Sequence, residues 1–245
     1  MTKKIALLAS ENSPALIPII KEFQRNKIII HSIILDSKAL SERELNRYCD
    51  RIGISPQNLE LLREKNVQLP VFKVDSHNDK ETADLIERIG VDILVNAGTP
   101  RILKTRILEA PTMGVINCHP GILPNFRGCS CVEWALYLDE KVGNTIHWMT
   151  EEIDKGLILS TEELTFTKSD RYVDIRRKVY DSGYQLLAST VAKLVEDILE
   201  APRSLNEADG KYFEPIPDKL LALVKEKLIA GEYRFQSNSS SNDRW

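Results

Sequence analysis

The sequence predicts an α/β protein with a Rossmann-like, mostly parallel sheet flanked by helices. Strand-like and helix-like segments alternate through the first half of the 245 residues. The segment 27–36 reads K-I-I-I-H-S-I-I-L-D, and such a β-branched run is typical of a strand buried on both faces. Parallel strands need crossover helices between them, so the alternation itself favours a parallel sheet with right-handed connections.

The elements of the first half can be assigned in chain order. Residues 5–9 form a short apolar run and are predicted as the first strand. Ser13 and Pro14 predict the start of a helix that runs to Phe23, because serine caps helices and proline suits the first helical position. Pro18 implies that this helix starts late or is kinked. Beyond the strand at 27–36, the pattern predicts a peripheral helix within 41–65, strands at Val71–Val74 and 91–96, and an amphipathic helix at Lys80–Ile89.

The second half adds further elements and two C-terminal segments. The pattern predicts helices at 131–138, 169–199 and 217–229, and strands at 143–149 and 157–166. We expect one domain at 1–200, a short C-terminal appendage at 201–235 and a disordered tail at 236–245. The tail reads Q-S-N-S-S-S-N-D-R-W, which is too polar to bury a core.

Composition limits the classes of partner. The chain is 42% hydrophobic and 28% charged, with a formal net charge of −3, so it has no overall basic field for nucleic acid. The apolar run after Lys3 and Lys4 is too short for a secretory signal, and no run reaches membrane-spanning length. Four irregularly spaced cysteines favour reduced thiols in a cytoplasmic protein, and Cys129 and Cys131 lack a second pair, so we predict no metal site.

Candidate functional residues are densest in 113–158. A β-branched strand leads into Asn117 and His119, whose side chains project to the same side because strand residues alternate faces. Pro120 restricts His119 to extended geometry. The sequence therefore predicts an amide and an imidazole side by side at a strand end, where open α/β sheets bind ligands. Taken singly, Asn117 also fits a turn and His119 a hydrogen-bonded loop histidine.

This segment resembles the folate-dependent formyltransferases, which include glycinamide ribonucleotide transformylase, methionyl-tRNA formyltransferase and the sugar N-formyltransferases. The family pattern is N-x-H-P-(S/G)-x-L-P-x-(F/Y)-(R/K)-G, followed by D-x-G. Here the first block runs from Asn117 to Gly128, and Asp154 and Gly156 form the second. A third block, A-G-T-P-R-I-L at 97–103, is similar to the family's folate loop, and three blocks in the family's order form a specific match.

The resemblance implies an N-formyltransferase with the formyltransferase fold in 1–200 and N10-formyltetrahydrofolate as its donor. Formyl transfer to an amine needs a hydrogen-bond donor for the developing oxyanion and a group that moves protons near neutral pH. By resemblance, Asn117 is the oxyanion donor, His119 moves the proton, and Asp154 orients the imidazole. Asp154 also fits an ordinary Asp-Lys-Gly turn.

Two segments are assigned to the folate donor by the same resemblance. The predicted folate-binding residues are Gly98, Arg101, Ile102, Leu103, Thr150, Glu151 and Ile153. The first segment would hold the pterin mainly through backbone groups; the alternative for Arg101 is a solvated side chain between a strand and a helix. His147, in the middle of a predicted strand, is interpreted as a structural hydrogen-bonding residue.

The acceptor is predicted from a departure from the family pattern. Glycinamide ribonucleotide transformylase has a glycine-rich phosphate turn after its first strand, whereas this chain reads S-E-N-S-P at 10–14, where Glu11 would repel a phosphate. We expect a nucleotide-linked amino sugar as the acceptor. Ser10, Asn12 and Arg127 are assigned to substrate binding, although a loop arginine commonly pairs locally.

Other functions stay open from the sequence. They are glycinamide ribonucleotide transformylase, formyltetrahydrofolate hydrolase and a non-catalytic folate- or nucleotide-binding module. The negative charge and the lack of room for the C-terminal barrel of tRNA formyltransferases count against a tRNA acceptor, and an N-terminal regulatory domain of the kind known in deformylases is not expected. We expect small-molecule substrates, with no nucleic-acid or membrane partner, and a homodimer remains one alternative for the assembly.

Overall fold

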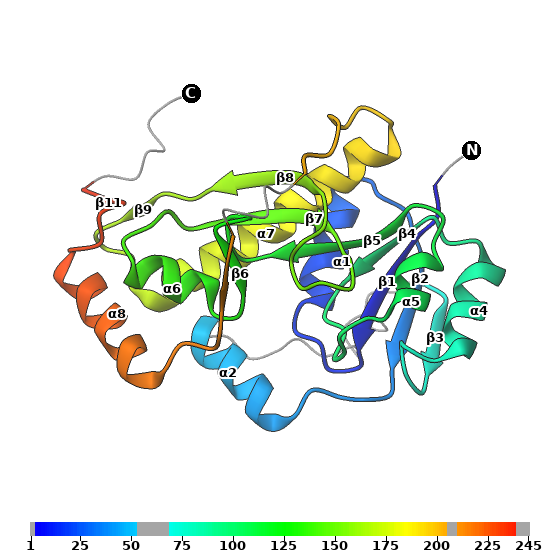
Figure 1. Cartoon of the computed structure of the whole chain (residues 1–245), viewed down its shortest axis with the longest axis horizontal. Helices are drawn as coiled ribbons and strands as arrows, with labels where there is room; N and C mark the ends of the chain where they lie inside the picture. The colour runs from blue at the N-terminus through cyan, green and yellow to red at the C-terminus, as the bar shows by residue number, and fades with distance from the viewer. Residues whose placement is uncertain (1–2, 53–68, 205–209, 239–245) are drawn as a thin grey trace.

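A seven-stranded sheet forms the centre of the computed structural model, which describes residues 3–52, 69–204 and 210–238. The strand order is β3-β2-β1-β4-β5-β7-β8 (Figure 1). The strands of this sheet are β1 Ile5–Ser10, β2 Ile30–Asp36, β3 Val71–Val74, β4 Ile93–Asn96, β5 Gly114–His119, β7 Gly143–Trp148 and β8 Ile158–Glu163. The first five strands pair in parallel, and β7 and β8 are antiparallel to their neighbours. The predicted mostly parallel, Rossmann-like sheet is confirmed.

Helices cover both faces of the sheet because its strands bury alternate side chains on opposite sides. Ile5, Leu7 and Ala9 of β1 pack into a core with α1 and α7, whereas Ala6 and Leu8 pack into a second core with α4 and α5. The helices are α1 Leu16–Arg25, α2 Glu42–Ile52, α4 Lys80–Ile89, α5 Thr105–Glu109, α6 Cys131–Tyr137, α7 Tyr172–Val195 and α8 Asp218–Ala230. Within the described ranges, none of these helices has the length and apolar character needed to cross a membrane.

The start of α1 differs from the prediction. Its N-cap is Ala15, and the Ser13 hydroxyl instead donates a hydrogen bond to the Ala97 carbonyl at 2.7 Å. Pro18 is therefore the third residue of the helix, where a backbone N–H would have no acceptor within the helix. The helix starts late, as Pro18 implied, and the Ser13 hydroxyl also accepts from the Ala15 N–H at 3.3 Å.

Two predicted segments divide differently in the structure. The strand expected at 157–166 is split into β8 and a short β9, Phe166–Thr167. β9 pairs with β11, Gln236–Ser237, so the expectation of disorder from residue 236 onward is wrong for these two residues. Of the peripheral helix expected within 41–65, the part from residue 53 lies outside the described residues, as does the tail from 239.

The C-terminal segment shares a core with the main domain. Strand β10, Lys211–Phe213, pairs in parallel with β6, Phe126–Gly128, which directly follows the Asn117 block. Helix α8 confirms the helix expected at 217–229. The third core contains Phe126, Cys131, Val132, Ala135, Leu136, Val142, Phe166, Tyr172, Ile175, Val179, Phe213, Ile216, Val224, Leu228 and Tyr233. The predicted appendage is thus packed into the fold rather than attached to it.

Candidate active site

Polar residues end the parallel strands at one edge of the sheet. β2 ends in Asp36, β4 in Asn96 and β5 in His119, with Asn117 two residues earlier on β5. Because parallel strands present their carboxyl ends at the same edge, these side chains gather there. Strand β7 runs antiparallel to β5 and places His147 opposite Asn117. The structure therefore brings residues from distant parts of the chain to one site.

Asp154 lies between two histidine rings. Its Oδ2 is 3.4 Å from Nδ1 of His119, and its Oδ1 is 3.6 Å from Nε2 of His147. The backbone N–H of Gly128 donates to Oδ2 at 2.8 Å, and only 9% of the Asp154 side chain is exposed. Asp154 follows β7 and has φ +53, a left-handed conformation that aspartate tolerates. The structure thus joins Asp154 to His119 as the resemblance implied. Asp154 also lies in a turn, and this turn brings its carboxylate to the histidine.

The ring of His119 is fixed on its other side. Its Nε2 donates to the carbonyl oxygen of Phe126 at 2.8 Å, and the residue is 4% exposed. Gly121 packs against the ring so closely that a Cβ there would lie 2.6 Å from Nε2. Since a carbonyl only accepts, Nε2 keeps its hydrogen, and Nδ1, which faces Asp154, is the nitrogen that can exchange a proton.

Asn117 is held between another asparagine and a histidine. Its Oδ1 accepts from Nδ2 of Asn96 at 2.9 Å, and its Nδ2 donates to Nε2 of His147 at 3.2 Å. His147 donates from Nδ1 to the Trp148 carbonyl at 2.9 Å. Burial, together with the nearby charge of His119, lowers the pKa of His147 to about 4, against the opposing effects of Asp154 and the Trp148 carbonyl. His147 is therefore neutral at pH 7, and its Nε2 accepts from Asn117.

Sequence reasoning placed His147 in a structural role and did not single out Asn96. The contacts of His147 with Asn117 and Asp154 put it in the site itself. The only signal in the sequence was positional: His147 stands in a strand near the motif, and Asn96 precedes the 97–103 block. Neither position says which strand becomes the neighbour of β5.

A cavity of about 170 Å³ opens beside this cluster. It is lined by Arg101, Ile102, Leu103, His147, Met149, Thr150, Glu151, Glu152, Ile153 and Asp154. Six of the seven predicted folate-binding residues are among them. Ile102 is 71% exposed and Ile153 is 42% exposed, so apolar side chains stand free beside polar groups. Such a lining suits a flat heteroaromatic ring with polar edges.

Gly98, the seventh predicted folate-binding residue, shapes the loop rather than lining the cavity. It has φ +98, which favours glycine, and a Cβ there would lie 2.0 Å from Oγ of Ser13. Only glycine allows the 97–103 loop to pass this close to the start of α1.

The Arg101 side chain ties the same loop to β2. Its guanidinium forms a two-pronged ion pair with the buried Asp36, with Nη2 at 2.8 Å from Oδ1, and Nη2 also donates to the Asp75 carbonyl at 3.0 Å. Burial by itself would raise the pKa of Asp36, but hydrogen bonds from Arg101 and from the His77 and Lys38 backbone lower it below its ordinary value. The alternative of a solvated arginine is wrong, and the carbonyl of Ile102 in the same loop accepts from Nδ2 of Asn78 at 3.0 Å.

The three predicted substrate-binding side chains make internal contacts. Ser10 is fully buried and donates to Oδ1 of Asn12 at 3.2 Å. Asn12 is bonded in both directions to the backbone of Leu40, at 2.8 Å each. Nη2 of Arg127 donates to the Gly210 carbonyl at 3.0 Å, which is local pairing with the C-terminal segment. A role for these residues in substrate binding stays a prediction.

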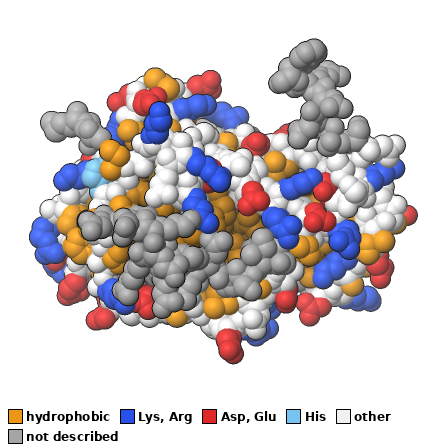
Figure 2. Space-filling view, turned by 180° about the vertical axis from the view of Figure 1, so that it is seen from behind, with side chains coloured by type: hydrophobic (Ala, Val, Ile, Leu, Met, Phe, Trp, Pro, Cys, Tyr) orange, Lys and Arg blue, Asp and Glu red, His pale blue; other side chains and the backbone are white. Residues whose placement is uncertain are grey.

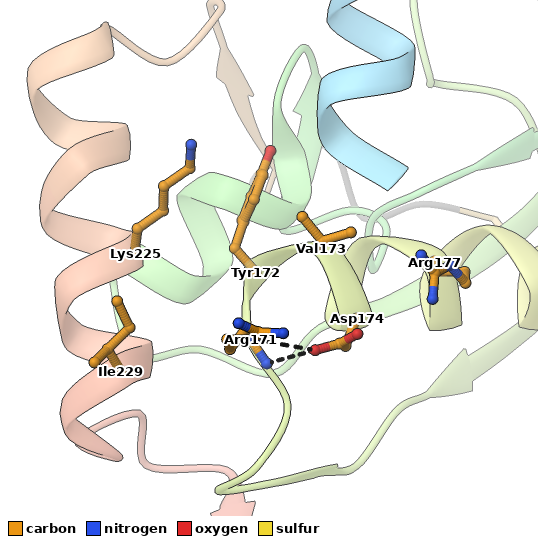
Figure 3. Close-up of a pocket in the computed structure, with 7 residues that line it drawn as sticks. All are labelled: Arg171, Tyr172, Val173, Asp174, Arg177, Lys225 and Ile229. Carbon is orange, nitrogen blue, oxygen red and sulfur yellow. Dashed lines mark hydrogen bonds and ion pairs between the residues drawn. The ribbon is translucent and has the colours of Figure 1, made fainter. Parts of the chain in front are cut away.

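A larger cavity of about 570 Å³ lies between the N-terminal turn of α7 and helix α8 (Figure 3). Its lining consists of Arg171, Tyr172, Val173, Asp174, Arg177, Lys225 and Ile229. Arg171 and Asp174, at the start of α7, are paired with each other (Figure 3). Despite its size, it contains none of the predicted site residues and shares no lining residue with the smaller cavity. Chemistry rather than volume therefore identifies the candidate active site.

Comparison with known proteins gives a match over most of the chain. The sequence profile of the family described as Formyl transferase matches residues 3–191. A methionyl-tRNA formyltransferase of Clostridium tetani is 30% identical over 179 residues, which cover 73% of this chain and 56% of that protein. The chain spans about half the length of the curated relatives it matches.

Solved structures show the same fold. A sugar N-formyltransferase from a Shewanella species is 21% identical with a TM-score of 0.61, covering 88% of this chain and 78% of that one. A glycinamide ribonucleotide transformylase from Symbiobacterium toebii is 22% identical with a TM-score of 0.61, covering 84% and 95%. Because the family profile spans well over half of the sequence, this chain belongs to the formyl transferase family.

Proposed function

We propose that this protein transfers the formyl group of N10-formyltetrahydrofolate to the amino group of a small acceptor, a nucleotide-linked amino sugar. The observation that supports this most is the contact of His119 with Asp154, to which Asn117 is linked through His147, beside the cavity lined by predicted folate-binding residues. Family membership supports formyl transfer, and the exposed apolar side chains of Ile102 and Ile153 in the cavity lining suit a pterin ring.

The hydrogen bonds of each site residue determine the role we propose for it. Asn117 uses one N–H on His147, which leaves its second N–H for the oxygen that becomes negative during transfer. His119 has Nε2 committed to Phe126, so Nδ1 takes the proton from the acceptor amine and passes it to the leaving nitrogen. Asp154 stabilises the imidazolium in between. The bound donor supplies the formyl carbon, and its N10 receives the proton as the C–N10 bond breaks.

The acceptor class is supported by what surrounds the end of β1. Glu11 forms an ion pair with Lys73 at the position where a phosphate turn would stand, and Asn12 is occupied by Leu40. These contacts do not favour a phosphoribosyl acceptor. On the face seen in Figure 2, basic and acidic side chains are interspersed, which does not favour a polyanion such as tRNA. The fold likeness to a sugar N-formyltransferase is consistent with an amino sugar.

A substrate screen tests this function. The protein is incubated with N10-formyltetrahydrofolate alone, with a panel of nucleotide-linked amino sugars, and with glycinamide ribonucleotide, and release of tetrahydrofolate and formate is followed. We expect folate release that depends on one amino sugar and yields its N-formyl product. Formate release without any amine would show a hydrolase, and turnover only with glycinamide ribonucleotide would refute the proposed acceptor.

Substitution of the central residues tests the assignment of roles. We expect Asn117→Ala and His119→Ala each to lower kcat by at least about 10²-fold, the typical cost of removing an oxyanion donor or a proton-transfer group. Circular dichroism should show both variants folded. Asn125→Ala, an exposed asparagine in the following loop, is the matched control and should keep wild-type activity. Full activity in either central variant would contradict the assignment.

A further inference from the structure

One chain of hydrogen bonds crosses the site between two groups of the backbone. At its first end, the N–H groups of Gly98 and Thr99 both donate to Oδ1 of Asn96, at 3.0 Å each. Asn96 then donates to Asn117 at 2.9 Å, and Asn117 donates to His147 at 3.2 Å. At its other end, the His147 ring donates to a main-chain carbonyl at 2.9 Å.

The two ends require the same direction of donation. A backbone N–H can only donate, so the oxygen of Asn96 faces the 98–99 loop and its nitrogen faces Asn117. A carbonyl can only accept, so the proton of neutral His147 sits on Nδ1, and its Nε2 accepts. Asn117 is left with one consistent orientation, with oxygen toward Asn96 and nitrogen toward His147. The shape of an amide alone would not distinguish its two ends.

We propose that Asn96 is a positioning residue that fixes the direction of the Asn117 amide and ties it to the 97–103 loop. For its effect on catalysis this rests on the proposed formyl transfer. The donor from Asn96 keeps the Asn117 oxygen turned away, so that the free N–H of Asn117 faces the reacting oxygen. Without that donor the Asn117 amide can rotate by about 180°. Its oxygen would then stand where a hydrogen-bond donor is needed.

We call this chain of hydrogen bonds, from the Gly98 and Thr99 N–H groups to the Trp148 carbonyl, the relay. Its first end is rigid, so Asn96 can hold the Asn117 amide in one direction. Asn96 ends β4 beside β5, and its oxygen accepts two N–H groups of the tight turn that follows. Gly98 in this turn is packed against Ser13, whose hydroxyl is bonded to the Ala97 carbonyl at 2.7 Å. The loop that lines the candidate folate cavity thus sets the orientation of the amide in the reaction centre.

Asn96→Asp removes the hydrogen bond to Asn117 but keeps the bonds that anchor the loop at Gly98 and Thr99. The introduced carboxylate has the same size and still accepts from Gly98 and Thr99, but it cannot donate to Asn117. We expect kcat to fall on the order of 10²-fold, the scale of a misplaced catalytic group, with little change in the KM of the formyl donor. The ratio of variant to wild-type kcat should rise as pH is lowered, because a protonated carboxyl donates again. Asn26→Asp makes the same charge change at an exposed position after α1 and should leave kcat unchanged.

A measurement that does not depend on turnover completes the test. Nitrogen-15 NMR of the histidine rings should show wild-type His147 neutral with its proton on Nδ1, and should show a proton added at Nε2 in Asn96→Asp, where the inverted amide presents an oxygen. If Asn96→Asp does not fold, Asn96→Ser, which is too short to reach Asn117, replaces it in both assays.

The outcomes separate the relay from the reaction. A wild-type proton on Nε2 of His147, unchanged kcat in the variants, or a pH-independent loss with a raised donor KM in Asn96→Asp would overturn the role of Asn96. If wild-type protein transfers formyl to no acceptor, the proposed function fails, whereas the NMR result still decides whether the relay exists.

Discussion

Two histidines share one carboxylate in this site, and their hydrogen bonds give them different roles. His119 points Nδ1 at Asp154 and has its other nitrogen on a main-chain carbonyl. His147 contacts the same carboxylate but also accepts from Asn117. With a pKa of about 4, His147 is suited to orienting an amide and not to carrying a proton at neutral pH. The proton-transfer role proposed for this site is therefore assigned to His119.

The buried neutral His147 predicts a pH dependence of stability. Its pKa falls from 6.5 to about 4 on folding, so between these values the unfolded chain binds a proton that the folded chain does not. This group therefore leaves the free energy of unfolding unchanged above pH 6.5. As pH falls from 6.5 toward 4, it lowers the free energy of unfolding by at most about 1.4 kcal/mol per pH unit.

Urea unfolding at pH 7 and pH 5 measures this effect. We expect the loss of unfolding free energy between the two values to be smaller in His147→Gln, which cannot be protonated, than in the wild type. An equal loss in both proteins would show that other groups cause the acid sensitivity.

At the scale of elements, the turn after β7 carries Asp154 into the site. Gly156 lies against the end of β7, where an added Cβ would be 1.7 Å from the Trp148 carbonyl oxygen. Trp148 is in turn bonded through its N–H to the Leu157 carbonyl at 3.0 Å, so the turn cannot easily shift away. The glycine of the D-x-G block is thus explained by packing, and its effect reaches Asp154 through the backbone.

We expect Gly156→Ala to displace this turn. Unfolding free energy should fall by about 1 to 3 kcal/mol, the usual cost of overpacking, and kcat should fall at least 10-fold because Asp154 moves from His119. Gly231→Ala is the control, with φ +67 at the end of α8 and the nearest other atom at 3.4 Å. It should lose about 1 kcal/mol from backbone strain with activity intact. Full activity in Gly156→Ala would contradict the role of the turn.

At the scale of the whole molecule, the C-terminal segment helps to build the site. β10 pairs with β6, and Gly128 at the end of β6 donates its N–H to Asp154. Arg127 reaches the carbonyl of Gly210 in the same segment. Because α8 buries its apolar side in a core shared with α6 and α7, the segment and the main domain should unfold as one unit.

Substitution of two neighbouring residues of α8 tests whether the C-terminal segment unfolds together with the main domain. Leu228 is 1% exposed and Ile229 is 75% exposed. We expect Leu228→Ala to lower the free energy of unfolding by about 2 to 5 kcal/mol in a single transition, whereas Ile229→Ala should change it by less than about 0.5 kcal/mol. Fluorescence and circular dichroism during urea unfolding should report the same midpoint. Two separate transitions would show that the segment folds independently.

The sequence alone determined the features that depend on local geometry. Alternating side chains placed Asn117 and His119 on one side of a strand, and apolar runs with helices between them predicted the parallel sheet. The resemblance in the motif blocks then indicated Asp154 and six of the residues that line the smaller cavity.

Only the tertiary structure decided the contacts between distant elements. It joined Arg101 to Asp36, bonded Asn12 to Leu40, and placed Asn96 and His147 on either side of Asn117. It also paired β11 with β9, where polarity predicted disorder. The physical reason is that hydrophobic period and backbone preference act within a few residues, whereas each polar side chain takes whichever partner the packed sheet brings into reach.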